Sequence, residues 1–209
     1  MGSAAEFLPE RTTLPALREA VQGCRGCDLY RDTTQAVFGK GPDRARVVMV
    51  GEQPGDKEDL AGRPFVGPAG SLLDDAIEGA GLSRDDIYIT NVVKHFSHVL
   101  RGKRRIHKKP NAEQVKACAP WLEAELTRIG PDVLVLLGAT AAQALLGRSF
   151  RVTQQRGEFV ESPLAPLVTA TIHPSSILRA ETDEDRRVAF DGLVRDLAKV
   201  RGALTARAS

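Results

Sequence analysis

The sequence predicts an α/β protein: a single-domain, three-layer α/β/α sandwich built around a central, mostly parallel four-stranded sheet. Runs of apolar, β-branched residues recur at positions 46–50, 87–90 and 133–137, and such runs are typical of strands buried on both faces. Stretches with helical apolar spacing separate them. Strands that alternate with helices in this way imply a parallel sheet covered on both faces.

The first half of the chain supplies two strands and two helices. A short helix is expected over residues 14–21 and a first strand over 46–50. A long connection then leads to a helix over 71–80, which Gly81 can end as a C-cap, and to a second strand over 87–90. The segment from there to Pro110 is expected to be a polar, basic loop.

The second half repeats the alternation. Asn111 can cap a helix over 112–129, and Pro131 separates that helix from a central strand. The remaining expected elements are a helix at 139–146, a strand-like segment at 152–160, a strand at 167–172 and a last helix at 184–200. We expect one domain over 1–209 with its core at about 14–200, and loosely ordered ends at 1–12 and after about 202.

Composition excludes several classes of protein. The 209 residues suffice for one well-packed core, and 42% hydrophobic with 27% charged residues is ordinary for a soluble globule. A net charge of +2 does not by itself identify a nucleic-acid binder. No apolar run could span a membrane, and the first residues lack a signal segment. We therefore expect a cytoplasmic, monomeric protein without membrane contacts.

The segment 51–70 carries the strongest functional signal. It reads GEQPGD followed by GRPFVGPAG and leaves the carboxyl end of the first strand, where open α/β sheets place ligands. No lysine follows its glycines and no GxGxxG opens a helix, so it is not a Walker or Rossmann motif. A plain connection made of turn residues is the alternative, but this segment is longer than most such connections.

Polar or aromatic residues also follow other strands. Asn91 comes after the second strand and His173 after the strand at 167–172, while Phe65 lies in the glycine-rich segment. An amide offers a donor and an acceptor to a base edge, an aromatic ring offers a stacking face, and imidazole can donate to a departing base. Each residue alone has a structural alternative, as a turn, core or capping residue.

Residues 101–109 form the one strongly basic stretch, with six cations in nine residues and His107 among them. Such clustering favours contact with phosphates. A solvated surface loop without a function is the alternative.

The three cysteines exclude a fully paired disulfide framework. Cys24 and Cys27 form a CxxC pair, which suits a redox pair, half of a metal site or two spectator thiols. Cys118, within an expected helix, could equally be an inert core residue.

Segment 51–70 resembles the first active-site motif of the iron–sulfur uracil-DNA glycosylases, and the resemblance extends over roughly residues 24–198. Asn91 and the run from His173 to Ser176 match that family's asparagine and its HPS motif. The resemblance implies a glycosylase that removes uracil from single-stranded and double-stranded DNA and releases free uracil. It places Gly51, Gly55, Asp56, Phe65, Asn91 and Ser175 in the substrate pocket.

The same resemblance implies a 4Fe–4S cluster with a structural role. Cys24, Cys27 and Cys118 match three of the family's cysteine ligands, and His95 stands at the position of the fourth. Imidazole can replace thiolate on iron, as in Rieske centres. A zinc ion held by the same four residues is the alternative.

The Lys-Arg-Arg-Ile-His-Lys stretch and Gln53 resemble the X-type glycosylases. That resemblance implies that His107 attacks C1′ of the sugar once uracil has left and stays covalently bound to it. We expect Glu52 to accept a hydrogen bond from the other ring nitrogen and so fix the tautomer. The catalytic set is then His107, Glu52, His173 and Gln53, and the DNA-binding set is Lys103, Arg104, Arg105 and Lys108.

Two alternatives stay open at this point. The first is a conventional hydrolytic glycosylase of the same fold, in which the basic loop only grips DNA. The second is a metal-containing nucleic-acid-binding module without catalysis.

Overall fold

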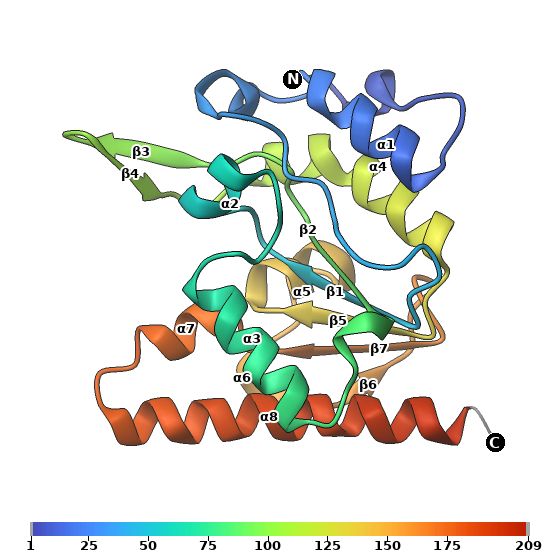
Figure 1. The fold of residues 1–209 in the computed structure, drawn as a ribbon, viewed down its shortest axis with the longest axis vertical. Coiled ribbons are helices and arrows are strands. Elements are labelled where there is room, and N and C mark those ends of the chain that lie inside the picture. The colour runs from blue at the N-terminus through green and yellow to red at the C-terminus, as the bar shows by residue number, and fades with distance from the viewer. Residues whose placement is uncertain (1, 208–209) are drawn as a thin grey trace.

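Five strands form the central sheet, in the order β2-β1-β5-β7-β6 (Figure 1). The computed structural model describes residues 2–207. Four strands are parallel, and β6 pairs antiparallel with β7 at one edge. The strands are β1 (Val47–Gly51), β2 (Ile87–Asn91), β5 (Val133–Leu137), β6 (Phe159–Val160) and β7 (Leu167–Thr171). The predicted mostly parallel sheet is confirmed, but the predicted number of four strands is wrong, because β6 adds a fifth.

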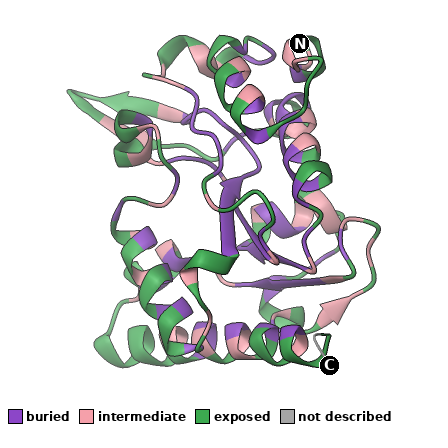
Figure 2. Ribbon diagram, turned by 45° about the vertical axis from the view of Figure 1, so that its right-hand side comes forward, coloured by how far each residue is buried: buried purple, intermediate pink, exposed green. Residues whose placement is uncertain are grey.

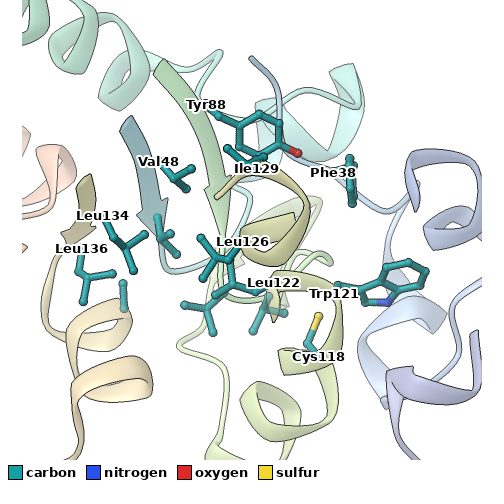
Figure 3. Close-up of a cluster of buried hydrophobic side chains, with 14 of the residues drawn as sticks. Phe38, Val48, Tyr88, Cys118, Trp121, Leu122, Leu126, Ile129, Leu134 and Leu136 are labelled. Carbon is teal, nitrogen blue, oxygen red and sulfur yellow. The ribbon is translucent and has the colours of Figure 1, made fainter. Parts of the chain in front are cut away.

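Helices cover both faces of this sheet, so the three-layer architecture is confirmed. On one face, α3 (Pro68–Gly79), α7 (Pro174–Leu178) and α8 (Asp183–Ala206) pack against alternate strand residues such as Met49 and Val135. On the other, α1 (Leu14–Ala20), α4 (Ala112–Ile129) and α5 (Ala139–Leu146) enclose the intervening ones. Figure 3 shows this second core, where Leu122 and Leu126 of α4 face Val48 and Leu134 of the sheet, while Trp121 lies on the other side of the helix. Period-two alternation along each strand thus supplies both cores.

The register aligns the carboxyl ends of the parallel strands. Gly51 at the end of β1 pairs with Asn91 at the end of β2, and Leu137 of β5 pairs with Thr171 of β7. The segments that follow these strands therefore converge on one edge of the sheet, as expected for a ligand site in an open α/β fold.

Three segments differ from the sequence prediction. The connection after β1 contains a short helix, α2 (Asp56–Ala61), and the expected basic loop contains a hairpin of β3 (His98–Arg101) and β4 (Arg104–His107). Gly102 turns this hairpin with a φ of 61°. The expected strand at 152–160 is wrong: its first half is α6 (Val152–Gln155), and only β6 is extended. Short 3-10 helices complete the fold at Ala4–Phe7, Val21–Gly23, Asp28–Asp32 and Arg84–Asp86.

Both ends of the chain are more regular than expected. The 3-10 helix Ala4–Phe7 packs on α4 with Ala4 buried, and α8 continues to Ala206, with Leu204 in the core. Within the described residues, helical structure thus extends beyond the expected core of 14–200 on both sides. Over residues 2–207, no helix is both long and apolar enough to cross a bilayer.

Candidate active site

A cavity of about 740 Å³ opens at the carboxyl edge of the sheet. It is lined from the segments that follow β1, β2, β5 and β7, and from the hairpin, which contributes His107. A second cavity of about 770 Å³ lies beside it, between α3, α7 and α8. We place the candidate active site in the first cavity, because buried polar side chains from separate strands converge there.

Glu52 directly follows β1 and is held by two side chains. Its Oε1 lies 3.2 Å from Nε2 of His107, and its Oε2 accepts a hydrogen bond from the hydroxyl of Thr140 on α5. Burial alone raises the pKa of Glu52, but the hydrogen bonds from His107 and Thr140 outweigh it, and the pKa lies below its ordinary value. Glu52 is therefore a carboxylate at neutral pH, and the side chain is 19% exposed.

His107 lies at the end of β4, at the wall of the cavity. Its side chain is 54% exposed, and its ring centroid lies 6.4 Å from that of the buried Phe96. Because a carboxylate only accepts hydrogen bonds, the nitrogen next to Glu52 carries a proton. The structure thus brings the predicted pair together, and the nitrogen that meets the carboxylate is Nε2.

Gln53 fastens the base of the hairpin. Its Nε2 donates to the carbonyls of Ser97 and Lys108, both at 3.1 Å, and its Oε1 accepts from the amide of Ser97 at 3.0 Å. The side-chain amide lines the cavity, but its polar atoms are engaged by backbone. These contacts hold both ends of the hairpin that carries His107, and the catalytic role predicted for Gln53 stays a prediction.

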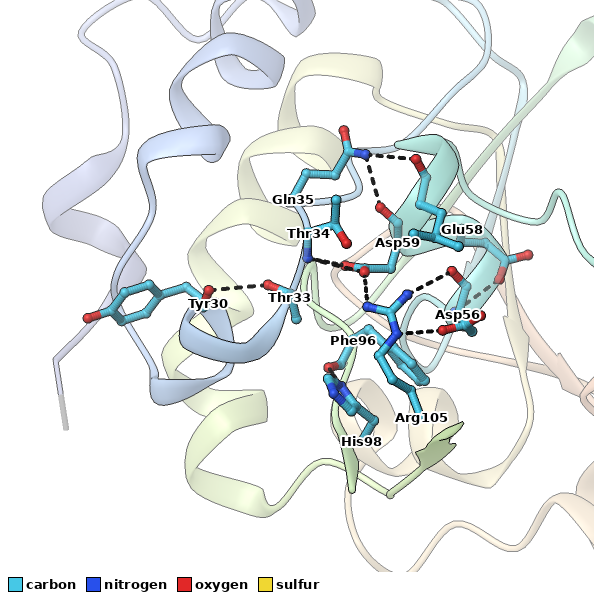
Figure 4. Close-up of polar contacts among 12 residues, drawn as sticks. Tyr30, Thr33, Thr34, Gln35, Asp56, Glu58, Asp59, Phe96, His98 and Arg105 are labelled. Atoms are coloured by element: carbon cyan, nitrogen blue, oxygen red, sulfur yellow. Dashed lines mark hydrogen bonds and ion pairs between the residues drawn. The ribbon is translucent and has the colours of Figure 1, made fainter. Parts of the chain in front are cut away.

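Arg105 turns inward from the hairpin, as Figure 4 shows. Its guanidinium pairs with Asp56 at 2.6 Å and with the fully buried Asp59 at 2.5 Å, and it lies over the ring of Phe96. Asp59 also accepts from the amide of Thr34. Arg105 and Asp56 thus pair with each other in this structure, and the DNA contact predicted for Arg105 and the substrate contact predicted for Asp56 stay predictions. By contrast, Lys103, Arg104 and Lys108 are exposed, and most of the projecting hairpin has the colour of exposed residues in Figure 2.

Asn91 and Phe65 meet at Gly51. A Cβ on Gly51 would lie 2.4 Å from Asn91 Oδ1 and 2.8 Å from Phe65 Cζ, so only glycine permits this approach. Asn91 is buried, and among the described residues its Oδ1 has no hydrogen-bond partner. A buried acceptor without a partner is costly unless a ligand supplies the donor.

A strained loop presents the ring of Phe65, whose φ is 54°. The carboxylate of Glu58 holds this loop by accepting from the amides of Val66 (2.9 Å), Gly67 (2.7 Å) and Gly55 (3.1 Å). Glu58 occupies the cavity wall but was absent from the predicted site residues, because its partners are backbone amides that leave no side-chain signal.

His173 faces Phe65 across the cavity, with ring centroids 5.8 Å apart. The amide of Ser175 donates to its Nδ1 at 3.1 Å, and the Ser175 hydroxyl lies 2.8 Å from the same nitrogen. Nδ1 therefore bears no proton, and Nε2–H is the free donor of the neutral ring. Burial lowers the pKa of His173 to about 4, so the ring is neutral at physiological pH.

All three cysteines are buried, and Cys118 lies within α4. Trp121 Nε1 lies 3.2 Å from Cys24 Sγ, and the amide of Lys94 lies 3.3 Å from Cys118 Sγ. His95, the predicted fourth ligand, is also buried, and burial lowers its pKa to about 4. Within residues 2–207, no three His, Cys, Asp or Glu side chains are arranged closely enough to hold a metal ion. The ligand set of Cys24, Cys27, His95 and Cys118 stays a prediction.

A comparison with known protein families finds a match over the part of the chain that forms this cavity. The family model described as the uracil DNA glycosylase superfamily matches residues 38–198, a range that contains every cavity residue named above. The chain belongs to the uracil-DNA glycosylase superfamily.

Individual members of the superfamily are similar over most of their length. A type-4 uracil-DNA glycosylase of Thermotoga maritima is 38% identical over 84% of this chain and 88% of its own. A type-4 enzyme of Pyrobaculum aerophilum is 34% identical over 86% of this chain and 94% of its own. A type-5 uracil-DNA glycosylase of Thermus thermophilus is 36% identical over 53% of each chain.

Proposed function

We propose that this superfamily member excises uracil from DNA and then bonds His107 to C1′ of the resulting abasic sugar. The observation that carries the proposal is the contact between His107 Nε2 and the Glu52 carboxylate at the wall of the cavity. A conventional glycosylase needs no imidazole at that place, whereas a nucleophile needs an adjacent base.

The cavity offers a partner for each part of a uracil nucleotide. Asn91 Oδ1 would accept from uracil N3–H, and the amide nitrogen would donate to O4. Phe65 would stack on the base. The Nε2–H of neutral His173 would donate to O2 as negative charge develops there, which stabilises the departing base without a proton transfer.

Each bond and proton of the covalent step can be assigned to uracil, the sugar, His107 or Glu52. The bond between C1′ and uracil N1 breaks, and its electron pair leaves with the base. The unprotonated Nδ1 of His107 then bonds to the electron-deficient C1′ through its lone pair, while the proton of Nε2 passes to Glu52 Oε1, 3.2 Å away. The product is a neutral imidazole substituted at Nδ1, with Nε2 no longer protonated. An alkylated imidazole is a poor leaving group, so the adduct should persist.

A hydrolytic glycosylase is the second candidate. It is favoured by the relatives named type-4 uracil-DNA glycosylase and by Glu52, whose carboxylate could also accept a proton from water. In that case the hairpin would serve only to hold DNA.

The expected partner is uracil-containing DNA, single-stranded as well as double-stranded, with free uracil as the released product. Lys108 follows the half-exposed His107, and Lys103 and Arg104 are exposed at the turn of the same hairpin. Cations so placed would engage phosphates on both sides of a flipped nucleotide. We propose that the protein works as a monomer in the cytoplasm.

A 4Fe–4S cluster is the proposed cofactor, with zinc as the alternative occupant. The proposed ligands are three buried thiols and a neutral imidazole, which are groups that can bind iron or zinc. N–H groups lie near the sulfur atoms of Cys24 and Cys118. Such ligands would tie the N-terminal segment to α4 and to the segment after β2. A structural cluster of this kind supplies cross-linking and not chemistry at the sugar. Visible absorption and iron analysis of the purified protein distinguish an iron–sulfur cluster from zinc.

The test uses a uracil-containing single-stranded oligonucleotide and a denaturing gel. The native protein should give a shifted protein–DNA band that resists denaturant, and His107→Gly should release uracil with repeated turnover and leave no such band. Free abasic DNA from the native protein would contradict the covalent step and favour the hydrolytic enzyme. No uracil release by either protein would contradict glycosylase activity altogether.

A further inference from the structure

We infer that Thr140 is a positioning residue of this site: its hydroxyl holds one oxygen of the Glu52 carboxylate so that the other oxygen faces His107. The inference rests on the proposed function. Thr140 Oγ1 donates to Glu52 Oε2, and Glu52 Oε1 is the atom that meets His107 Nε2. The two oxygens of one carboxylate are thus divided between two partners.

Three separate elements bring these side chains together. Glu52 follows β1, His107 ends the exposed hairpin, and Thr140 lies in the first turn of α5. The neighbours of Thr140 on that helix, Ala141 and Ala142, are fully buried in the core. Thr140 is therefore attached to the rigid part of the molecule, whereas His107 is carried by a hairpin that projects from it (Figure 1).

A fixed carboxylate matters because the proposed base must meet a nucleophile that is carried by a different element, the projecting hairpin. A glutamate has three rotatable side-chain bonds, and a free carboxylate could turn Oε1 away from Nε2. The bond from Thr140 removes that freedom before substrate arrives, which is the advantage of a preorganised site. Because Oε2 is engaged by Thr140, Oε1 faces His107 Nε2.

The surroundings of Glu52 give this arrangement a measurable signature. Its titratable neighbours are His107 from β4 and His173 from the segment after β7. Burial raises the pKa of Glu52, while the bonds from His107 and Thr140 lower it. Without the Thr140 hydroxyl, the carboxylate should therefore take up a proton at a higher pH than in the native protein.

The experiment compares Thr140→Val, which removes the hydroxyl at similar volume, with Thr140→Ser, which keeps it. We expect Thr140→Val to slow adduct formation about tenfold, as for loss of a hydrogen bond to a charged group. The acid limb of its pH–rate profile should move to higher pH. Thr140→Ser should stay within about twofold of the native rate and keep the native profile.

A second readout needs no reaction. Titration of the Glu52 side-chain carboxyl by ¹³C NMR in the free protein should give a higher midpoint for Thr140→Val and a native midpoint for Thr140→Ser. An unchanged midpoint in Thr140→Val, or equal damage from both substitutions, would overturn the assignment. If the native protein forms no adduct, the covalent function fails, and the NMR titration still decides the role of Thr140.

Discussion

Arg105 reaches from the hairpin to the fully buried carboxylate of Asp59, 2.5 Å away, and so ties the strand that ends in His107 to helix α2. Removing Arg105 would leave the buried Asp59 carboxylate with the amide of Thr34 as its remaining hydrogen-bond donor among the described residues. We expect Arg105→Ala to lower the free energy of unfolding by ~3 kcal/mol and to slow adduct formation more than uracil release. Urea denaturation and single-turnover assays measure the two effects.

Arg104→Ala is the matched control, because Arg104 neighbours Arg105 on the same strand and is exposed. It should leave the free energy of unfolding within about 0.5 kcal/mol. Equal loss of stability in both variants would show that the internal ion pair does not hold the hairpin.

Gln53→Ala should loosen the base of the hairpin. The substitution removes three hydrogen bonds, two buried ones to Ser97 and a partly buried one to Lys108, and leaves their backbone groups without these partners. We expect uracil release to continue while adduct formation falls at least about tenfold, because His107 loses its fixed place near Glu52. Amide hydrogen exchange over residues 97–108 should be faster than in the native protein. Unaltered exchange there would mean that other contacts hold the hairpin.

Gly51→Ala should block the base pocket. A methyl group at that position would lie 2.4 Å from Asn91 Oδ1 and 2.8 Å from Phe65 Cζ, so the amide or the ring must move. Uracil release should fall roughly 100-fold, read in a single-turnover assay. Gly23→Ala is the control, because a Cβ there meets no atom within 4 Å. Native activity of Gly51→Ala would contradict the assigned place of the base.

His173 should give the folded protein a particular dependence on pH. Burial lowers its pKa to about 4, against an ordinary value of 6.5. Between these values the unfolded chain binds a proton that the folded chain does not, so stability should fall as pH drops from 6.5 towards 4. His173→Gln should reduce that slope, measured as melting temperature against pH. The slope of the native protein would persist in the variant if His173 did not titrate in this way.

The neutral state of the His173 ring also predicts how uracil release depends on pH. Since His173 needs no proton beyond its Nε2–H, uracil release should persist at pH 5.5, where an ordinary imidazole is mostly protonated. A loss of release centred on pH 6.5 would contradict the neutral donor.

Residues that follow buried strands could be placed from sequence, because the strands themselves are clear. Asn91 and His173 come directly after apolar runs, and parallel pairing brings such positions to one edge. The capped helix Ala112–Ile129 was predicted with its observed bounds, since Asn111 begins it and Gly130 ends it in a left-handed conformation.

The features that were not predicted from sequence depend on contacts between residues that are far apart along the chain. The stretch 98–107 is so rich in charge that it resembles a loop, yet Gln53, 44 residues before Ser97, and Asp59, 46 residues before Arg105, hold it as a hairpin. Recognition of α2 would have revealed Asp56 and Asp59 as a pair three residues apart on one helical face. The strand predicted at 152–160 is wrong because the β-branched residues of this segment lie at its ends. The chain turns between them at Gly157, with a φ of 71°.

Helix α8 runs for 24 residues, a span of about 36 Å, along the lower side of the molecule in Figure 1. Its first turn follows the segment that leaves the pocket at Arg179, and its last turn lies on the opposite flank. A fluorophore or affinity handle joined beyond Ala206 would therefore sit far from captured DNA. Such a fusion should be able to mark uracil sites in a genome without hindering access to them.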